Sequence, residues 1–358
     1  MGGFMLQFVL RLLWRLRHGA TCYPSFMEQL APNAIAVESR VQVDGKVVTS
    51  RGPGTTMEYA VALVEQLYGK EKAKEVSDPM VMRSNHADEY VITELNPVEW
   101  TFDDCPKRVR ERKPKKAKTK PLLPCCELRS CEGHHRQTPR PVGLTPAAAA
   151  ALSPSSHSVT TPDAQTGSAI PGVSDLILVP IANGTEEMEA VIIIDILRRA
   201  KANVVVASVD DKLEILASRK VKLVADVLLD EAAKFSYDLI VLPGGIGGAQ
   251  AFANSEKLVN LLKQQREANK PFGAICASPA LVLEPHGLLK GKKATAFPAL
   301  SNKLSDQSEA ENRVVVDGNL ITSRGPGTTI EFALAIVEKL FGRTKALEIA
   351  RTTLFISP

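Results

Sequence analysis

The chain has 358 residues, of which 44% are hydrophobic and 23% charged, ordinary values for a globular protein of one or two domains. Six cysteines at irregular positions in so long a chain do not form the framework of a small secreted domain, so we expect a reducing compartment. No apolar run reaches the 18 or so residues of a membrane span. The net charge of +4 is local, because residues 107–120 carry nine Lys/Arg and one acid. The remaining chain is mildly acidic.

Residues 1–19 are set apart as a leader. The first 27 residues contain no Asp or Glu, but Arg11, Arg15 and Arg17 lie among large apolar side chains. This is the pattern of an organelle transit segment. The alternative, which the sequence leaves open, is an arbitrary leader.

An internal repeat is the strongest sign of domain organisation. Residues 38–75 match residues 311–348 at a constant offset of 273, with 24 of 38 positions identical. The second copy is preceded by about 120 residues of patterned sequence that the first copy lacks. We therefore predict a complete domain over 174–358 and the C-terminal half of a like domain over 20–106. Half a domain cannot close a core alone, so we expect it to be poorly ordered or docked on the complete domain.

Residues 107–173 are rich in Pro, Ser, Thr and Arg and show no helical or strand period, so we predict a disordered linker. Its basic run is either a solvated linker or insertion, which we favour, or a nuclear-localisation or nucleic-acid patch. Within it, the group of Cys125, Cys126, Cys131, His134 and His135 fits no standard zinc spacing, and we predict no metal site.

The complete domain alternates short apolar runs with helical patterns. This predicts an α/β fold with a mostly parallel sheet covered on both faces. The predicted strands and helices, in chain order, are strand 176–180, helix 186–200, strands 204–209 and 237–242, helix 257–268, strand 271–275, helix 278–286, a hairpin of 313–316 and 320–322, and helix 328–341. Ligands of such sheets bind at the carboxyl ends of the strands.

Cys276 follows a predicted strand and begins a predicted helix among small residues, as a nucleophile on a sharp turn does. A helix N-terminus lowers a thiol pKa, which would activate Cys276. The alternative is an inert buried cysteine. Gly244 and Gly245 follow another strand and offer backbone N–H groups to an oxyanion, or form a simple tight turn. Glu189 is either a protonated carboxyl beside the thiol or a surface acid at a helix start.

Four motifs occur in order, namely GTEEMEA (184–190), LPGG (242–245), GAICAS (273–278) and TSRGPGT (322–328). Together they closely resemble the ThiJ/PfpI superfamily, in the branch of the parkinsonism-associated protein deglycase and its tandem-domain plant homologues. The resemblance implies a flavodoxin-like three-layer α/β sandwich. It also implies a reactive Cys276 with protonated Glu189, and a pocket that includes Arg199 and Arg219. Gly244, Gly245 and Ala277 are the expected oxyanion donors.

The sequence departs from the family at one position. Many members place a histidine near the cysteine, and here Phe297 occupies the matching position. The protease-like branch has a histidine directly after the cysteine, where this chain has Ala277, so a protease is not expected. Any lyase step must then depend on Glu189, and the activity is expected to be weak.

The resemblance leaves three functions open. The first is detoxification of reactive carbonyls, as a glutathione-independent glyoxalase that converts methylglyoxal to lactate or as a deglycase. The second is a redox-sensing or chaperone protein that acts through oxidation of Cys276 and protein partners in the oxidative stress response. The third is an incomplete product of a two-domain gene without a function of its own.

The resemblance further implies no cofactor, no membrane partner, and a homodimer or an intramolecular pseudo-dimer of the two copies. The mildly acidic domains give no reason to expect nucleic acid. Cytoplasm and nucleus are the expected compartments, with a chloroplast or mitochondrion as the alternative.

Overall fold

A computed structural model describes residues 18–83, 90, 92–96 and 175–356, and all of them fall in one compact unit. The predicted linker, with its basic run and its Cys/His group, and most of the predicted leader lie outside the described residues. Within the described residues, no helix is long and apolar enough to cross a membrane.

The complete domain is built on an eight-stranded sheet in the order β10-β7-β6-β11-β12-β14-β13-β5. All neighbouring strands are parallel except the antiparallel pair β13 and β14. The central strands are short apolar runs buried on both faces, as expected under two layers of helices. The strands are β6 (Leu176–Ile181), β7 (Asn203–Ser208), β10 (Val227–Leu228), β11 (Leu239–Leu242), β12 (Phe272–Ile275), β13 (Val314–Asp317), β14 (Leu320–Ser323) and β5 (Thr93–Leu95).

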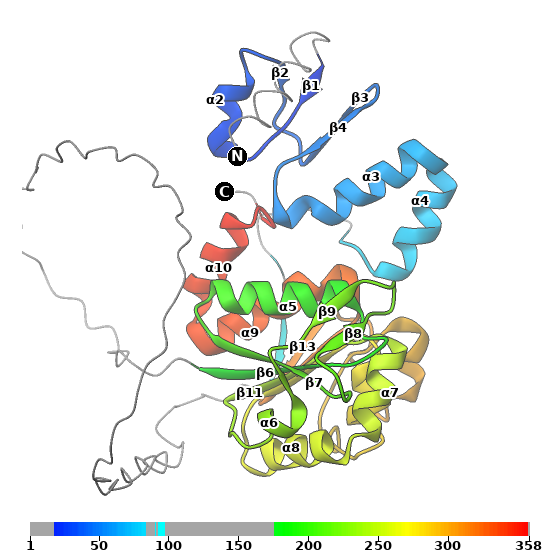
Figure 1. The fold of residues 1–358 in the computed structure, drawn as a ribbon, viewed down its shortest axis with the longest axis vertical. Helices are drawn as coiled ribbons and strands as arrows, with labels where there is room; N and C mark the ends of the chain where they lie inside the picture. The colour runs from blue at the N-terminus through cyan, green and yellow to red at the C-terminus, as the bar shows by residue number, and fades with distance from the viewer. Residues whose placement is uncertain (1–17, 84–89, 91, 97–174, 357–358) are drawn as a thin grey trace, which may run out of the picture. The chain divides into compact units, whose positions relative to one another are not determined.

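Helices cover both faces of this sheet. Helices α5 (Glu187–Arg199) and α9 (Thr329–Phe341) pack together on one face, and α6 (Leu229–Ala232) and α8 (Glu256–Glu267) lie on the other (Figure 1). The remaining elements are α7 (Ile246–Asn254), α10 (Arg343–Thr352), the hairpin β8 (Glu214–Leu216) and β9 (Lys222–Val224), and the short helices η6 (Pro298–Lys303) and η7 (Pro326–Thr328). The predicted three-layer α/β sandwich with a mostly parallel sheet is confirmed.

The structure differs from the prediction directly after Cys276. The predicted helix over 278–286 is instead a single π-helical turn, η5 (Pro279–Leu283), followed by turns. Pro279 stands at the first position of η5, where its missing N–H is tolerated. The π form is rare and is found mostly as single turns, frequently at functional sites.

The first copy repeats the secondary structure of the second from its hairpin onward. Strands β3 (Val41–Asp44) and β4 (Val47–Ser50) and helices α3 (Thr56–Tyr68) and α4 (Lys70–Ser77) correspond to β13, β14, α9 and α10. Ten residues of α9 are buried, but none of α3. Leu67 is 73% exposed, whereas its counterpart Leu340 is 8% exposed. The main helix of the first copy therefore has no covering layer among the described residues. Its other elements are β1 (Gly19–Ala20), η1 (Pro24–Phe26), α2 (Met27–Leu30), β2 (Ile35–Ala36), η2 (Pro53–Thr55) and η3 (Asp78–Met80).

Reciprocal contacts join the two copies. The Arg40 guanidinium donates to the Leu354 carbonyl at 2.9 Å, and Arg313, which corresponds to Arg40, donates to the Val81 carbonyl, also at 2.9 Å. Val81 and Leu354 are themselves counterparts, with the same left-handed φ of 60° and 61°. Each copy thus places the chain after its last helix against an arginine of the other. The described residues of the first copy therefore contact the second copy through this pair of arginines.

Candidate active site

Cys276 lies at the carboxyl end of β12, at the centre of the sheet, and is 8% exposed. Its φ is +62°, a conformation that non-glycine residues seldom adopt. Two backbone hydrogen bonds hold it there, from its N–H to the Ser323 carbonyl at 3.0 Å and from the Phe297 N–H to its carbonyl at 2.8 Å. Such held strain is typical of a functional residue on a sharp turn.

Glu189 enters the site from the first turn of α5. The Glu186 side chain caps this helix by accepting the Glu189 N–H at 2.8 Å. The Glu189 carboxyl is fully buried beside Cys276 and accepts the Gly244 N–H at Oε2 (2.7 Å), while its other oxygen, Oε1, is buried without a hydrogen-bond partner among the described residues. The proposed neighbourhood of thiol and carboxyl is present in the structure.

Glycine is required at position 244 by the closeness of these two groups. A Cβ there would lie 2.5 Å from the Cys276 Cβ and 2.6 Å from Glu189 Oε2. Gly245 has a φ of +86°, and a Cβ there would lie 2.3 Å from the Gly184 carbonyl oxygen. The LPGG motif therefore permits a close approach of three chain segments. It is more than a tight turn.

The amides of the site serve different groups. The Gly244 N–H is engaged by Glu189, so it is not directed at a substrate oxygen as we expected from the sequence. The Gly245 and Ala277 amides face the Cys276 sulfur closely enough to lower the pKa of the thiol. These two amides are placed to stabilise negative charge on or beside the sulfur.

Burial is the largest cause of the pKa shifts of Glu189 and Cys276. It raises the pKa of Glu189 to about 8, with a further increase from Glu186, so this carboxyl keeps its proton at neutral pH. Burial and the charge of Glu189 raise the pKa of the Cys276 thiol, while the Gly245 and Ala277 amides lower it. The expected activation by a helix N-terminus is thus outweighed, because a fully formed α-helix does not follow Cys276 and the thiol is buried.

The two arginines predicted to line the pocket lie near opposite ends of α5, Arg199 within the helix and Arg219 in a neighbouring segment. Arg219 is near the helix start, where its N–H donates to Glu187 Oε1 at 2.8 Å. Arg199 is in the last turn, ten residues and about 15 Å of helix from Glu189, and it pairs with Asp195 at 2.7 Å. The structure does not bring Arg199 to the Cys276 site. Phe297 is half-buried and adjoins the site through its hydrogen bond to Cys276.

Ser278 is a site residue that sequence reasoning missed. Its buried hydroxyl donates to the Pro243 carbonyl at 2.6 Å and so ties the turn after Cys276 to the LPGG motif. The small residue within GAICAS was the available signal, but hydroxyl direction has no sequence pattern. Within the described residues, no group of three or more His, Cys, Asp or Glu could hold a metal ion.

Fold and site together define an α/β protein with a strained cysteine and a protonated glutamate at the carboxyl ends of a parallel sheet. The model of the DJ-1/PfpI family matches residues 15–66 and 175–339. The chain belongs to the DJ-1/PfpI family.

Curated relatives extend the similarity over both copies. Protein DJ-1 homolog B and homolog A of Arabidopsis thaliana are 59% and 51% identical over 343 and 344 residues, 95% of this chain in each case. The chain spans 63% and 70% of the length of these two relatives.

Single-domain proteins match about half of the chain. Glutathione-independent glyoxalase DJR-1.2 of Caenorhabditis elegans is 33% identical over 174 residues, which cover 48% of this chain and 91% of that protein. The structure of oxidized Toxoplasma gondii DJ-1 is 43% identical, with a TM-score of 0.50, and covers 52% of this chain and 100% of its own.

Proposed function

We propose that the protein is a stress-protective enzyme that removes reactive dicarbonyls through Cys276, as a glutathione-independent glyoxalase acting on methylglyoxal or as a deglycase. The observation that carries the proposal is a strained, buried thiol with a buried, protonated carboxyl next to it, since a Cβ on Gly244 would meet both. Similarity to the C. elegans glyoxalase supports the same substrate class.

The proposed reaction begins with addition of the Cys276 sulfur to the aldehyde carbon of methylglyoxal. As the S–C bond forms, Glu189 gives its proton to the aldehyde oxygen and accepts the thiol proton, so one carboxyl relays both. The Gly245 and Ala277 amides stabilise the charge that develops on the sulfur and oxygen.

The hemithioacetal then rearranges through an enediol. A proton moves from C1 to C2 by way of Glu189, and the proton of the C1 hydroxyl passes to the C2 oxygen, giving a thioester of lactate on Cys276. Water cleaves this thioester and releases lactate and the free thiol. The net reaction adds one water to methylglyoxal and needs neither oxidant nor reductant. No histidine is required, but a single carboxyl has to serve every proton transfer, which accounts for the expected weak activity.

The test is turnover of methylglyoxal to lactate by the full chain. Cys276→Ser should remove the activity, and Glu189→Gln, which cannot relay a proton, should lower kcat/KM by about 10²-fold to 10⁴-fold. Cys22→Ser is the matched control, because Cys22 lies half-buried in the first copy and should be dispensable. Equal turnover by the Cys276 and Cys22 variants would remove the enzyme proposal.

A redox role is the second candidate, favoured by the two amides and the carboxyl that surround the sulfur. Two peroxide molecules would oxidise the thiol to a sulfinate and be reduced to water, and the sulfinate oxygens would accept hydrogen bonds from Glu189 and the amides. After mild peroxide treatment, mass spectrometry should find two added oxygens on Cys276 before any other cysteine changes. Oxidation spread evenly over the six cysteines would contradict this role.

A further inference from the structure

The edge of the complete domain is covered by a segment from outside it. We call residues 90–96 the strap, of which Val91 lies outside the described residues. Strand β5 of the strap pairs in parallel with β13, with Val316 opposite Glu94. The pairing continues past the strand, where the Gly318 N–H donates to the Leu95 carbonyl at 3.0 Å and the Asn96 amide donates to Asp317 Oδ1 at 2.8 Å. Without the strap, β13 would be an open sheet edge.

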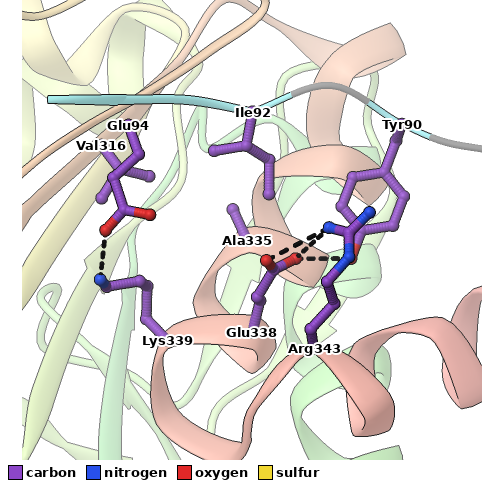
Figure 2. Close-up of a pocket in the computed structure, with 8 residues that line it drawn as sticks. All are labelled: Tyr90, Ile92, Glu94, Val316, Ala335, Glu338, Lys339 and Arg343. Carbon is purple, nitrogen blue, oxygen red and sulfur yellow. Dashed lines mark hydrogen bonds and ion pairs between the residues drawn. The ribbon is translucent and has the colours of Figure 1, made fainter. Parts of the chain in front are cut away.

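Alternate strap residues enter a groove formed by β13, α9 and the start of α10. Figure 2 shows Tyr90, Ile92 and Glu94 above this groove. Such alternation is the period of an extended strand. The groove is lined by Val316, Ala335, Glu338, Lys339 and Arg343, and a cavity of about 250 Å³ remains in it.

Tyr90 is the anchor of the strap. It is 3% exposed, and its hydroxyl donates to Glu338 Oε2 at 3.1 Å. The Arg343 guanidinium lies 5.9 Å from the centre of the tyrosine ring, and the Phe355 ring lies 6.5 Å from it. A buried aromatic ring whose hydroxyl is hydrogen-bonded is typical of the residues that supply most of the binding free energy at an interface.

The other two strap residues that face the groove, Ile92 and Glu94, are less buried than Tyr90. Ile92 is half-buried against the core, and Glu94 forms an ion pair with Lys339 (Figure 2). The ion pair is partly exposed, so it contributes little to affinity, but it favours an acidic residue at this position.

We propose that the groove beside β13 is a docking site for extended peptides with an aromatic, an aliphatic and an acidic residue at alternate positions, and that the strap occupies it in cis. Recognition is by strand addition: main-chain pairing with β13 supplies affinity, and the alternate side chains supply specificity. A tethered strand is present at an effective concentration on the order of millimolar, so the strap competes strongly with any external peptide. This site does not involve Cys276.

The experiment uses the full chain with its strap disabled by Tyr90→Asp and Ile92→Asp. The probe is a capped, fluorescent peptide of sequence YVITELN, the strap itself, and polarisation reports binding. The disabled chain should bind it at least about tenfold more tightly than the unmodified chain does. A peptide with Tyr and Val exchanged, and Ile and Thr exchanged, presents the wrong face and should bind at least about tenfold more weakly.

Reversing the charges of the Lys339–Glu94 pair tests the register in which the peptide pairs with β13. Lys339→Glu in the disabled chain should weaken binding of the strap peptide about twofold to fivefold, and a peptide with Lys in place of Glu94 should restore it. Equal binding of the native and exchanged peptides, or equal binding by the disabled and unmodified chains, would overturn the proposal. So would self-association of the disabled chain that the peptide fails to reverse. If the double variant does not fold by circular dichroism, Tyr90→Ala removes the anchor without burying a charge and takes its place.

Discussion

At the scale of single residues, Glu189 is a buried acid that destabilises the fold as the pH rises. Its folded-state pKa of about 8 lies above the ordinary value of 4.5. Between these two values the folded protein binds more protons than the unfolded chain, so the unfolding free energy falls with increasing pH. One such group contributes at most about 1.4 kcal/mol per pH unit.

We therefore expect Glu189→Gln to flatten the pH dependence of stability between about pH 5 and 8. Urea unfolding of the two proteins across this range is the measurement. Relative to the variant, the unmodified chain should lose stability steadily as the pH rises. Parallel curves for the two proteins would show that the Glu189 carboxyl is not held protonated.

At the scale of elements, the two copies of one arginine–glutamate pair differ in burial. Arg313 pairs with Glu331 at 2.7 Å, and the Glu331 side chain is 3% exposed. Arg40 pairs with Glu58 at 2.8 Å, and the Glu58 side chain is 21% exposed. Removing one partner of a buried pair leaves an uncompensated charge, whereas a more exposed charge is solvated by water.

We expect Arg313→Ala to lower the unfolding free energy by about 3–5 kcal/mol, and Arg40→Ala to lower it by clearly less. Each substitution removes two arginine–carbonyl hydrogen bonds between the copies, so the two variants are matched controls for one another. Denaturant unfolding followed by circular dichroism gives both values. Losses of equal size would mean that the inter-copy contact, and not the buried glutamate, sets the effect.

The sequence was sufficient to predict the elements whose apolar pattern is strong. Strands β6, β7 and β12 and helices α5, α8 and α9 lie within one residue of their predicted bounds at each end. Helix α7 was missed because its first turn, Ile246-Gly247-Gly248, has poor helix propensity. Its early glycines permit contact, since a Cβ on Gly248 would lie 2.6 Å from the Thr185 hydroxyl.

The candidate site could also be predicted only in part. Motif order placed Cys276, Glu189 and the LPGG glycines together, because all of them stand at the carboxyl ends of strands in one sheet. Sequence could not show that the Gly244 amide is used by Glu189, or that Arg199 pairs with Asp195. These choices depend on side-chain direction and on packing between distant segments.

At the scale of the whole molecule, matching sequence does not imply matching burial. Helices α3 and α9 share their pattern, yet only α9 is covered by α5. Contacts of the first copy with the second are made by Arg40 and by the chain around Val81. The described residues of the first copy thus contact the second copy without a covering layer over α3.

The two copies belong to one chain, so they are not subject to the symmetry that constrains the identical subunits of a homodimer. In a symmetric dimer every substitution occurs twice, once on each side of the axis. Here the counterparts Arg83 and Ile356 differ: the Arg83 guanidinium lies 5.2 Å from the centre of the Phe355 ring, while Ile356 is buried in the apolar core. Because each position is encoded separately, one side of the axis can acquire a charge while the other remains apolar. Repetition of a domain sequence within one chain thus allows the two sides of a reciprocal contact to carry different residues.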